Sequence, residues 1–160
     1  MKWQEVGETP CSMARSLAIL GDRWTLLILR NCFLGMRRFD EFQASLGVTR
    51  QVLADRLSRL VEAGALKKVP YQERPPRYEY RLTEMGHDLH PVLLALANWG
   101  DRWLDEGRGA PVEYVHKACG HKFRPTMVCP ECGEPVGSRD VTAVPGPGFA
   151  AMAGKLAQNG

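Results

Sequence analysis

Near the middle of the chain, the sequence predicts two short helices joined by a single glycine. The first covers residues 39–46, where apolar side chains recur at helical spacing. Gly47 makes a tight turn, and Thr49 is a good N-cap for a second helix that extends to Ala63. The apolar stripe of this second helix is narrow and its opposite face is polar. Such a pair must therefore pack on a further helix and leave one polar face outside.

Other segments supply that helix and a hairpin. Residues 11–20 predict a short helix, and 23–33 predict a helix that is apolar nearly all round and therefore central. After the glycine-linked pair, 66–71 and 77–82 read as strands of a hairpin with a proline-stiffened loop. Thr83 caps a last helix that is expected to extend to about Leu104. The fold class is therefore mainly α with a small β-hairpin, a winged helix-turn-helix.

Composition changes after residue 105 divide the chain into segments. A Gly/Pro-containing linker is followed by a Cys/His-rich segment, and the end is rich in Ala, Gly and Pro. The expected parts are an N-terminal arm (1–8), the winged helix-turn-helix (9–105), a linker (106–111), a small β zinc-ribbon-like unit (112–141) and a flexible tail (142–160).

Positive charge is concentrated in the middle of the chain. Residues 36–81 hold ten Lys or Arg and six Asp or Glu, a local charge of +4 in a chain whose net charge is +3. A local positive field suits a polyanion. Combined with the order of elements, it predicts binding of double-stranded DNA, with the second helix of the pair in the major groove.

The predicted DNA contacts come from three places. Side chains on the first turns of the second helix can reach base edges, where Arg pairs with guanine and Gln with adenine. Arginines ahead of the first helix and in the hairpin loop are suited to phosphates or the minor groove. The candidates are Arg37, Arg38, Thr49, Arg50, Gln51, Asp55, Arg56, Arg74 and Arg77.

Seven motifs over roughly residues 10–105 resemble the HxlR family of MarR-like winged-helix regulators. They are CSMAR at 11–15, LGDRWTLLILR at 20–30, RFDEF at 38–42, LSRL at 57–60, EAG at 62–64, ERPPRYEY at 73–80 and LTEMG at 82–86. The resemblance implies a dimeric repressor or activator that binds inverted repeats, with helices from both ends of the domain in the dimer interface.

The last predicted helix independently permits a homodimer. Its apolar residues recur at three- and four-residue steps, a longer stripe than so small a domain needs for its own core. The alternative is that the stripe packs on the central helix. The expected interface residues are Leu89, Val92, Leu93, Leu96, Trp99 and Trp103.

Cys11 stands at the start of the first helix, where backbone N–H groups favour a thiolate. In some members of the resembled family the matching cysteine senses electrophiles or oxidants, which makes Cys11 a candidate redox thiol. Simple packing is the alternative. Cys32, inside the central helix, is expected to be a core residue.

Two similar Cys/His turns follow the linker. His116 and Cys119 precede Gly120, and Cys129 and Cys132 precede Gly133, so each turn places two ligands three residues apart. Together they form a Cys₃His set of the kind that structural zinc favours. His121 is a rival to His116 as the fourth ligand. A metal-free β unit is the alternative, although so few apolar residues could hardly fold it.

Other functions find less support. No paired carboxylates, Gly-rich phosphate loop or Ser/His/Asp set suggests an enzyme, and no apolar run could span a membrane. The N-terminus has no signal pattern, so the expected compartment is the cytoplasm. The alternatives are a winged-helix protein-interaction adaptor with structural zinc and a thiol- or metal-responsive variant of the regulator. A small-molecule or electrophile effector is conceivable, but no residue pattern identifies one.

Overall fold

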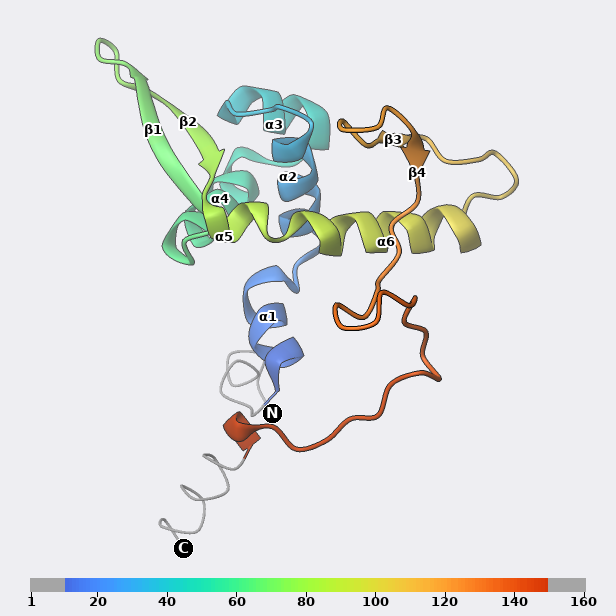
Figure 1. Ribbon diagram of the computed structural model, residues 1–160. Coiled ribbons are helices and arrows are strands. Elements are labelled where there is room, and N and C mark those ends of the chain that lie inside the picture. The colour runs from blue at the N-terminus through green and yellow to red at the C-terminus, as the bar shows by residue number, and fades with distance from the viewer. Residues whose placement is uncertain (1–10, 150–160) are drawn as a thin grey trace, which may run out of the picture. The chain divides into compact units, whose positions relative to one another are not determined.

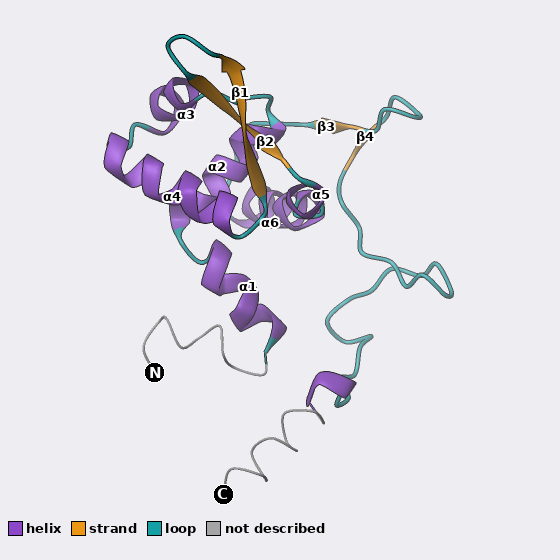
Figure 2. Ribbon diagram, turned by 90° about the vertical axis from the view of Figure 1, so that its left-hand side faces the viewer, coloured by secondary structure: helices purple, strands orange, loops and turns teal. Residues whose placement is uncertain are grey.

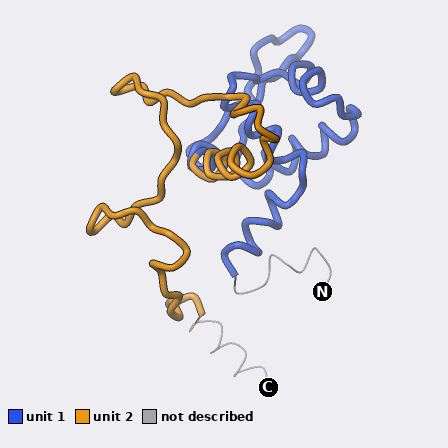
Figure 3. The backbone as a smooth tube through the Cα atoms, turned by 90° about the vertical axis from the view of Figure 1, so that its right-hand side faces the viewer, with its two compact units in different colours: residues 1–90, 151–160 blue, residues 91–150 orange. Residues whose placement is uncertain are grey.

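The structure, a computed structural model, describes residues 11–149 (Figures 1 and 2). They belong to two compact units, which divide between His90 and Pro91 and are coloured separately in Figure 3. The predicted arm at 1–8 and positions 150–160 of the predicted tail lie outside the described residues. No helix in the described part combines the length and apolar character that crossing a bilayer requires.

The first unit begins with α1 (Ser12–Leu20) and centres on α2 (Arg23–Phe33). Asp22 caps α2, since its Oδ1 accepts a hydrogen bond from the Trp24 backbone N–H at 2.9 Å. The interior side of α2 is fully buried and consists of Ile28, Leu29 and Asn31. The expected central helix is confirmed.

The next two helices are α3 (Phe39–Leu46), which has the predicted bounds, and α4 (Arg50–Glu62), which ends one residue before the predicted Ala63. Gly47 between them has φ +64°, a left-handed conformation that glycine adopts without steric cost. Thr49 Oγ1 accepts from the Val52 backbone N–H at 3.3 Å and so caps α4. The inner edge of α4 is buried in the core of this unit, and it consists of Leu53, Leu57 and Leu60.

The predicted wing is also present. Strands β1 (Leu66–Gln72) and β2 (Arg77–Leu82) pair antiparallel and project from the helices of this unit (Figure 1). An isolated antiparallel bridge joins Arg38 to Glu79 on β2. The segment before α3 therefore lies along the wing, a contact that the sequence did not predict.

The prediction of a single last helix is wrong. The structure has a one-turn α5 (Glu84–His87), a turn at residues 88–89, and then α6 (His90–Trp103). Pro91 explains the interruption, because proline lacks the N–H that would bond to the carbonyl of His87 and its ring would clash there. Proline is well tolerated in the first turn of the new helix.

Gly86 allows α5 to pack closely on the end of the helix-turn-helix. A Cβ atom at this position would lie 2.2 Å from the carbonyl oxygen of Ala65, so no other residue fits without a backbone shift. Thr83 Oγ1 caps the turn by accepting from the Gly86 N–H at 3.2 Å, and the Thr83 N–H donates to the same Ala65 carbonyl. The spacing of Thr83 and Gly86 therefore has a packing explanation.

The second unit contains most of α6 and a small hairpin of β3 (Tyr114–Val115) and β4 (Lys122–Phe123). Tyr114 pairs with Phe123, and the Cys/His turn lies between the two strands. The mainly helical winged fold with small antiparallel hairpins is thus confirmed. The zinc-ribbon-like character and the boundaries at 106–111 and 112–141 stay predictions.

An ion pair connects the start of α2 to α4. Arg56 Nη2 donates to Asp22 Oδ2 at 3.0 Å, and its Nε lies 2.9 Å from Asp22 Oδ1. Both side chains are largely shielded, with 21% of Arg56 and 33% of Asp22 exposed. The hydrogen bond from Arg56 is the main cause that holds the pKa of Asp22 below its ordinary value. One carboxylate therefore caps α2 and holds α4.

We expect Asp22→Ala to lower the free energy of unfolding by about 2 kcal/mol, because it removes an N-cap and leaves a partly buried guanidinium unpaired. Asp22→Asn keeps the cap acceptor and should cost less. The folded pKa of Asp22 is depressed, so its ion pair stabilises the fold above about pH 4 and is lost as the pH falls through the folded pKa. Urea unfolding at pH 7 and pH 3 measures this, and a gap between wild type and Asp22→Asn that does not shrink in acid would contradict the ion pair.

Candidate nucleic-acid interface

The outer face of α4 begins with two exposed polar residues, Arg50 and Gln51. The Arg50 side chain is 71% exposed. Its guanidinium lies 4.8 Å from the ring centroid of Phe39, and Nη1 lies 3.5 Å from Asp40 Oδ1 and 3.3 Å from Gln43 Oε1. Contacts with three residues of α3 therefore hold the Arg50 side chain in place, while its N–H donors stay accessible to solvent.

A groove of about 630 Å³ separates α3 and the start of α4 from the wing. Four basic and two acidic side chains line it, together with three tyrosines, which gives a net positive, partly aromatic surface. The lining residues are Arg38, Phe39, Asp40, Glu41, Arg50, Lys68, Tyr71, Pro76, Arg77, Tyr78 and Tyr80.

On the wing, two cations stack on tyrosine rings. Lys68 Nζ lies 4.4 Å from the ring centroid of Tyr78, on the neighbouring strand. A register shift after Pro70 breaks the regular pairing, and the guanidinium of Arg38 lies 4.8 Å from the ring centroid of Tyr71. Lys68, Tyr71 and Tyr78 were missed in the sequence analysis. Side-chain alternation along the two strands could have indicated Lys68 and Tyr78, whereas the placement of Tyr71 depends on the register shift.

The segment before α3 is fixed by its backbone. Glu41 Oε2 accepts hydrogen bonds from the N–H groups of Arg37 and Arg38, each at 2.9 Å. These two bonds are the main cause that lowers the pKa of Glu41. The Tyr80 N–H donates to the Arg37 carbonyl at 2.7 Å. The backbone is thus held between α3 and β2 while both arginine side chains remain exposed.

Most predicted DNA contacts lie on the surface of the first unit. Seven of the nine are exposed, namely Arg37, Arg38, Thr49, Arg50, Gln51, Arg74 and Arg77. Arg56 is different, because its guanidinium is held by Asp22 and also pairs with Asp55. The expectation that Arg56 faces DNA therefore needs correction. Residue 56 adjoins the buried Leu57, so it lies at the edge of the inward stripe and not on the outer face.

Asp55 is half-buried and is also engaged. Its Oδ2 lies 3.1 Å from Nε of Arg59, one helical turn later, in addition to the pair with Arg56. A carboxylate neutralised by two arginines has little need of a base-edge donor. The structure therefore favours an internal role for Asp55, and the base-contacting part of α4 is narrower than we expected.

One side of α6 is apolar and stays largely exposed among the residues that the structure describes. Its residues follow at steps of four, three and four, which place them on one helix face, and each is at least half exposed. The exposed stripe consists of Val92 (53%), Leu96 (50%), Trp99 (54%) and Trp103 (63%). Leu89 and Leu93, also expected in the dimer interface, are half-buried.

The five cysteines are all free thiols and differ in environment. Cys11 is exposed and occupies the N-cap position of α1. Cys32 is half-buried, and burial raises its pKa to about 12. The pKa of Cys129 is lowered by the backbone N–H groups of Cys132 and Glu131, followed by the thiol of Cys132.

The predicted zinc ligands lie in two separate pairs. His116 Nδ1 is 3.3 Å from Cys119 Sγ, while Cys129 and Cys132 interact with each other in the second turn. Among residues 11–149, no three His, Cys, Asp or Glu side chains gather closely enough to hold a metal ion. The zinc site therefore stays a prediction.

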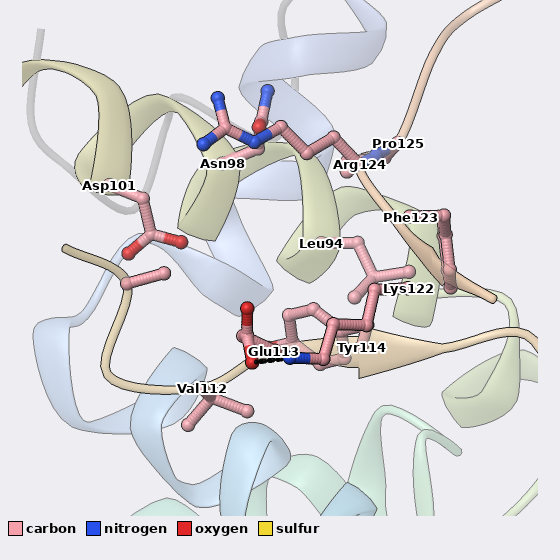
Figure 4. Close-up of a pocket in the computed structure, with 11 residues that line it drawn as sticks. Leu94, Asn98, Asp101, Val112, Glu113, Tyr114, Lys122, Phe123, Arg124 and Pro125 are labelled. Carbon is pink, nitrogen blue, oxygen red and sulfur yellow. Dashed lines mark hydrogen bonds and ion pairs between the residues drawn. The ribbon is translucent and has the colours of Figure 1, made fainter.

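The second unit contains a cavity of about 230 Å³ beside α6 (Figure 4). Leu94, Asn98 and Asp101 line it from the helix face opposite the exposed stripe, as their offset from Val92 requires. The β3–β4 hairpin closes another side, where Lys122 Nζ pairs with a Glu113 carboxylate oxygen at 2.5 Å. This mixed surface is a candidate place for a small molecule, although the effector itself stays a prediction.

Known proteins resemble this chain over the winged helix-turn-helix and over much of the segment that follows it. The family model described as HxlR-like helix-turn-helix matches residues 19–108. The chain is similar to Rv3095 of Mycobacterium tuberculosis, an uncharacterized HTH-type transcriptional regulator, with 46% identity over 140 residues that cover 88% of this chain and 89% of that protein.

Solved structures agree. PA1607, a candidate transcription factor, has a TM-score of 0.78 and 35% identity, covering 89% of this chain and 99% of its own. The redox regulator HypR in its reduced form has a TM-score of 0.55 and 29% identity, covering 57% of this chain and 92% of its own. The similarity to PA1607 therefore reaches past the winged helix into the second unit.

The environments of the thiols predict different reaction rates. At pH 8 we expect iodoacetamide to modify Cys32 at least about 100-fold more slowly than Cys11, because the thiolate is the reacting form and burial suppresses it at Cys32. Peptide mass spectrometry over time measures both rates. In denaturant the two cysteines should react alike, and equal rates in the folded protein would show that Cys32 is not protected.

Proposed function

We propose that this chain, which belongs to the HxlR-like helix-turn-helix family, acts in the cytoplasm as a homodimer that binds an inverted-repeat operator in duplex DNA. As a member of this family it is a transcriptional regulator, and its winged helix-turn-helix implies DNA binding. The role is one of binding and not of catalysis. The observation that carries the proposal is the exposed start of α4 beside a net positive groove.

The outer face of α4 suits the major groove of B-DNA. Its inner leucines are fully buried, so the helix can present only the opposite, polar face. Arg50 can donate two hydrogen bonds to O6 and N7 of guanine, and Gln51 can bond to adenine. In the free protein Arg50 is held by Asp40 and Gln43, so we expect DNA to replace these weak exposed contacts.

The groove beside α4 suits the sugar–phosphate backbone. Arg37 and Arg38 project from a backbone that is fixed by Glu41, and Lys68 lies on the facing strand of the wing. Arg74 and Arg77 at the far end of the hairpin can reach an adjacent minor groove or further phosphates. Phosphate contacts of this kind set the register of the protein on DNA, while the base contacts of α4 set the sequence.

We expect Arg50→Ala to weaken operator binding by about 1–3 kcal/mol and to relax the preference at one base pair in each half-site. Arg59→Ala is the matched control, because Arg59 is an exposed arginine of the same helix beyond the groove. Selection from random duplexes, followed by titration with the enriched sequence, measures both effects.

An equal loss of affinity for every sequence would instead make Arg50 a phosphate contact. If no duplex binds in a salt-dependent manner, the DNA-binding proposal fails, and a protein-interaction adaptor with the same fold becomes the better reading.

The proposed homodimer rests on the exposed stripe of α6. Four large apolar side chains in line would be costly to leave in water, and a second copy can cover them through a two-fold axis. A two-fold dimer would present two α4 helices to half-sites one turn of DNA apart, about 34 Å.

We expect Leu96→Asp to raise the dissociation constant of the dimer by about 100-fold or more, because symmetry would bury two unpaired carboxylates. Asn98→Asp adds a carboxylate to the same helix on the face opposite the stripe, and should leave the dimer intact. Sedimentation velocity over a range of concentrations measures the effect. A Leu96→Asp protein that stays dimeric would place the interface elsewhere.

Cys11 stays a candidate sensor thiol. It is exposed at the N-cap of α1, so an electrophile or oxidant can reach the thiol, and an adduct there would change the start of that helix. The similarity to the redox regulator HypR supports this proposal without extending that protein's chemistry to this chain.

A further inference from the structure

We propose that His116, Cys119, Cys129 and Cys132 of one chain bind a single structural Zn²⁺, which draws two matching turns of the second unit together. The site lies outside the proposed DNA interface and beyond residues 19–108, which the family model matches. Its support is a repeated backbone geometry that two different sequences adopt.

The first turn places an imidazole and a thiol side by side. His116 Nδ1 lies 3.3 Å from Cys119 Sγ. Ligand atoms at about 2.0 Å (N) and 2.3 Å (S) from a tetrahedral zinc lie about 3.5 Å from each other, so the pair is already spaced for a shared ion. This contact favours His116 over His121 as the nitrogen ligand.

The backbone of this turn is closed by two hydrogen bonds. The Gly120 N–H donates to the His116 carbonyl at 2.7 Å, and the His116 N–H donates to the His121 carbonyl at 2.9 Å. Gly120 has φ +73°. Val115, just before the turn, pairs with Lys122, just after it.

The second turn repeats every one of these features at the same offsets. The Gly133 N–H donates to the Cys129 carbonyl at 2.8 Å, and the Cys129 N–H donates to the Glu134 carbonyl at 2.9 Å. Gly133 has φ +75°. Val128 and Pro135 form the bridge that corresponds to the strand pair of the first turn. Two turns with the same conformation, each carrying two soft ligands, form the two halves of a tetrahedral site.

The rest of the second unit provides little else to stabilise the turns. The apolar side chains of the hairpins are exposed, with 52% of Val115, 39% of Phe123 and 50% of Val128 accessible. A segment this small and this poor in buried apolar surface is stabilised by a metal, a covalent link or packing on a larger element. All five cysteines are free thiols and the turns bury few apolar side chains, so a metal would supply stability that the turns otherwise lack.

The two turns need to approach each other, and the chain between them allows it. No three potential ligands gather within the described residues, so each turn presents only half a site. Residues 124–127 between the turns form neither helix nor strand, and rotation there can bring the halves together without breaking a described strand pair. The short tether favours ligands from one chain over ligands from two, because it keeps the second pair at a high effective concentration.

The test uses the full-length protein, reduced and freed of metal by a chelator, and titrated with Co²⁺. We expect one Co²⁺ per chain, with the strong visible absorption of a tetrahedral thiolate site, and displacement by Zn²⁺. Cys119→Ser, Cys132→Ser and His116→Ala should each lower the affinity at least about tenfold, since even loss of a residue that only supports a ligand costs that much. Cys11→Ser and His121→Ala are the matched controls and should bind as wild type does.

Two results would overturn the proposal. If the wild-type protein shows no stoichiometric tetrahedral spectrum, the turns hold no metal. If Cys132→Ser abolishes binding while Cys119→Ser and His116→Ala do not, the turns do not share one ion. Amide hydrogen exchange of the wild-type protein, with and without Zn²⁺, avoids the risk of misfolded variants, and residues 114–136 should become protected in both turns. The Leu96→Asp protein should still bind one ion per chain, and loss of binding there would contradict ligands from a single chain.

Discussion

Burial of one edge of α4 determines which face of this helix the first unit exposes to a partner. Leu53, Leu57 and Leu60 are enclosed by the core, and the Asp22–Arg56 ion pair fixes the rotation of the helix about its axis. With these contacts made, Arg50 and Gln51 can only face outward. The wing is then aligned with that face by the bridge from Arg38 to Glu79. Packing of the core thus sets the orientation of the proposed interface. Core substitutions that rotate α4 would alter DNA recognition although the substituted residues do not contact DNA.

The sequence predicted the parts of the first unit that local chemistry determines. The cap at Thr49 and the glycine turn at 47 mark helix ends, because they satisfy or relax the backbone at those points. The break between α5 and α6 was missed, since a proline can either bend a helix or begin a new one, and only the packing around Gly86 decides. The sequence analysis placed too many residues on the outer face of α4, for a similar reason. Whether Arg56 turns inward depends on Asp22, 34 positions earlier.

The site residues that were missed depend on pairing between strands. Lys68 meets Tyr78 across the hairpin, and the position of Tyr71 follows from a register shift that has no clear mark in the sequence. In the second unit, by contrast, the ligand spacing was evident but the separation of the two turns was not. Backbone hydrogen bonds within each turn are local, whereas the approach of one turn to the other would depend on the proposed ion, and no local pattern encodes that approach. The β3–β4 hairpin, which holds the first turn, also lines the cavity beside α6.

The resting position of Arg50 has a consequence for how a regulator searches a genome. In the free protein its guanidinium lies over Phe39, with Asp40 and Gln43 both beside it. On random sequence the side chain can therefore stay docked on its own protein, and the complex relies on phosphate contacts that permit sliding. A guanine in the right place offers a bidentate pair that outcompetes those local partners. The arrangement would shorten the time that the protein stays at wrong sites, because Arg50 would contact a base only where the sequence matches.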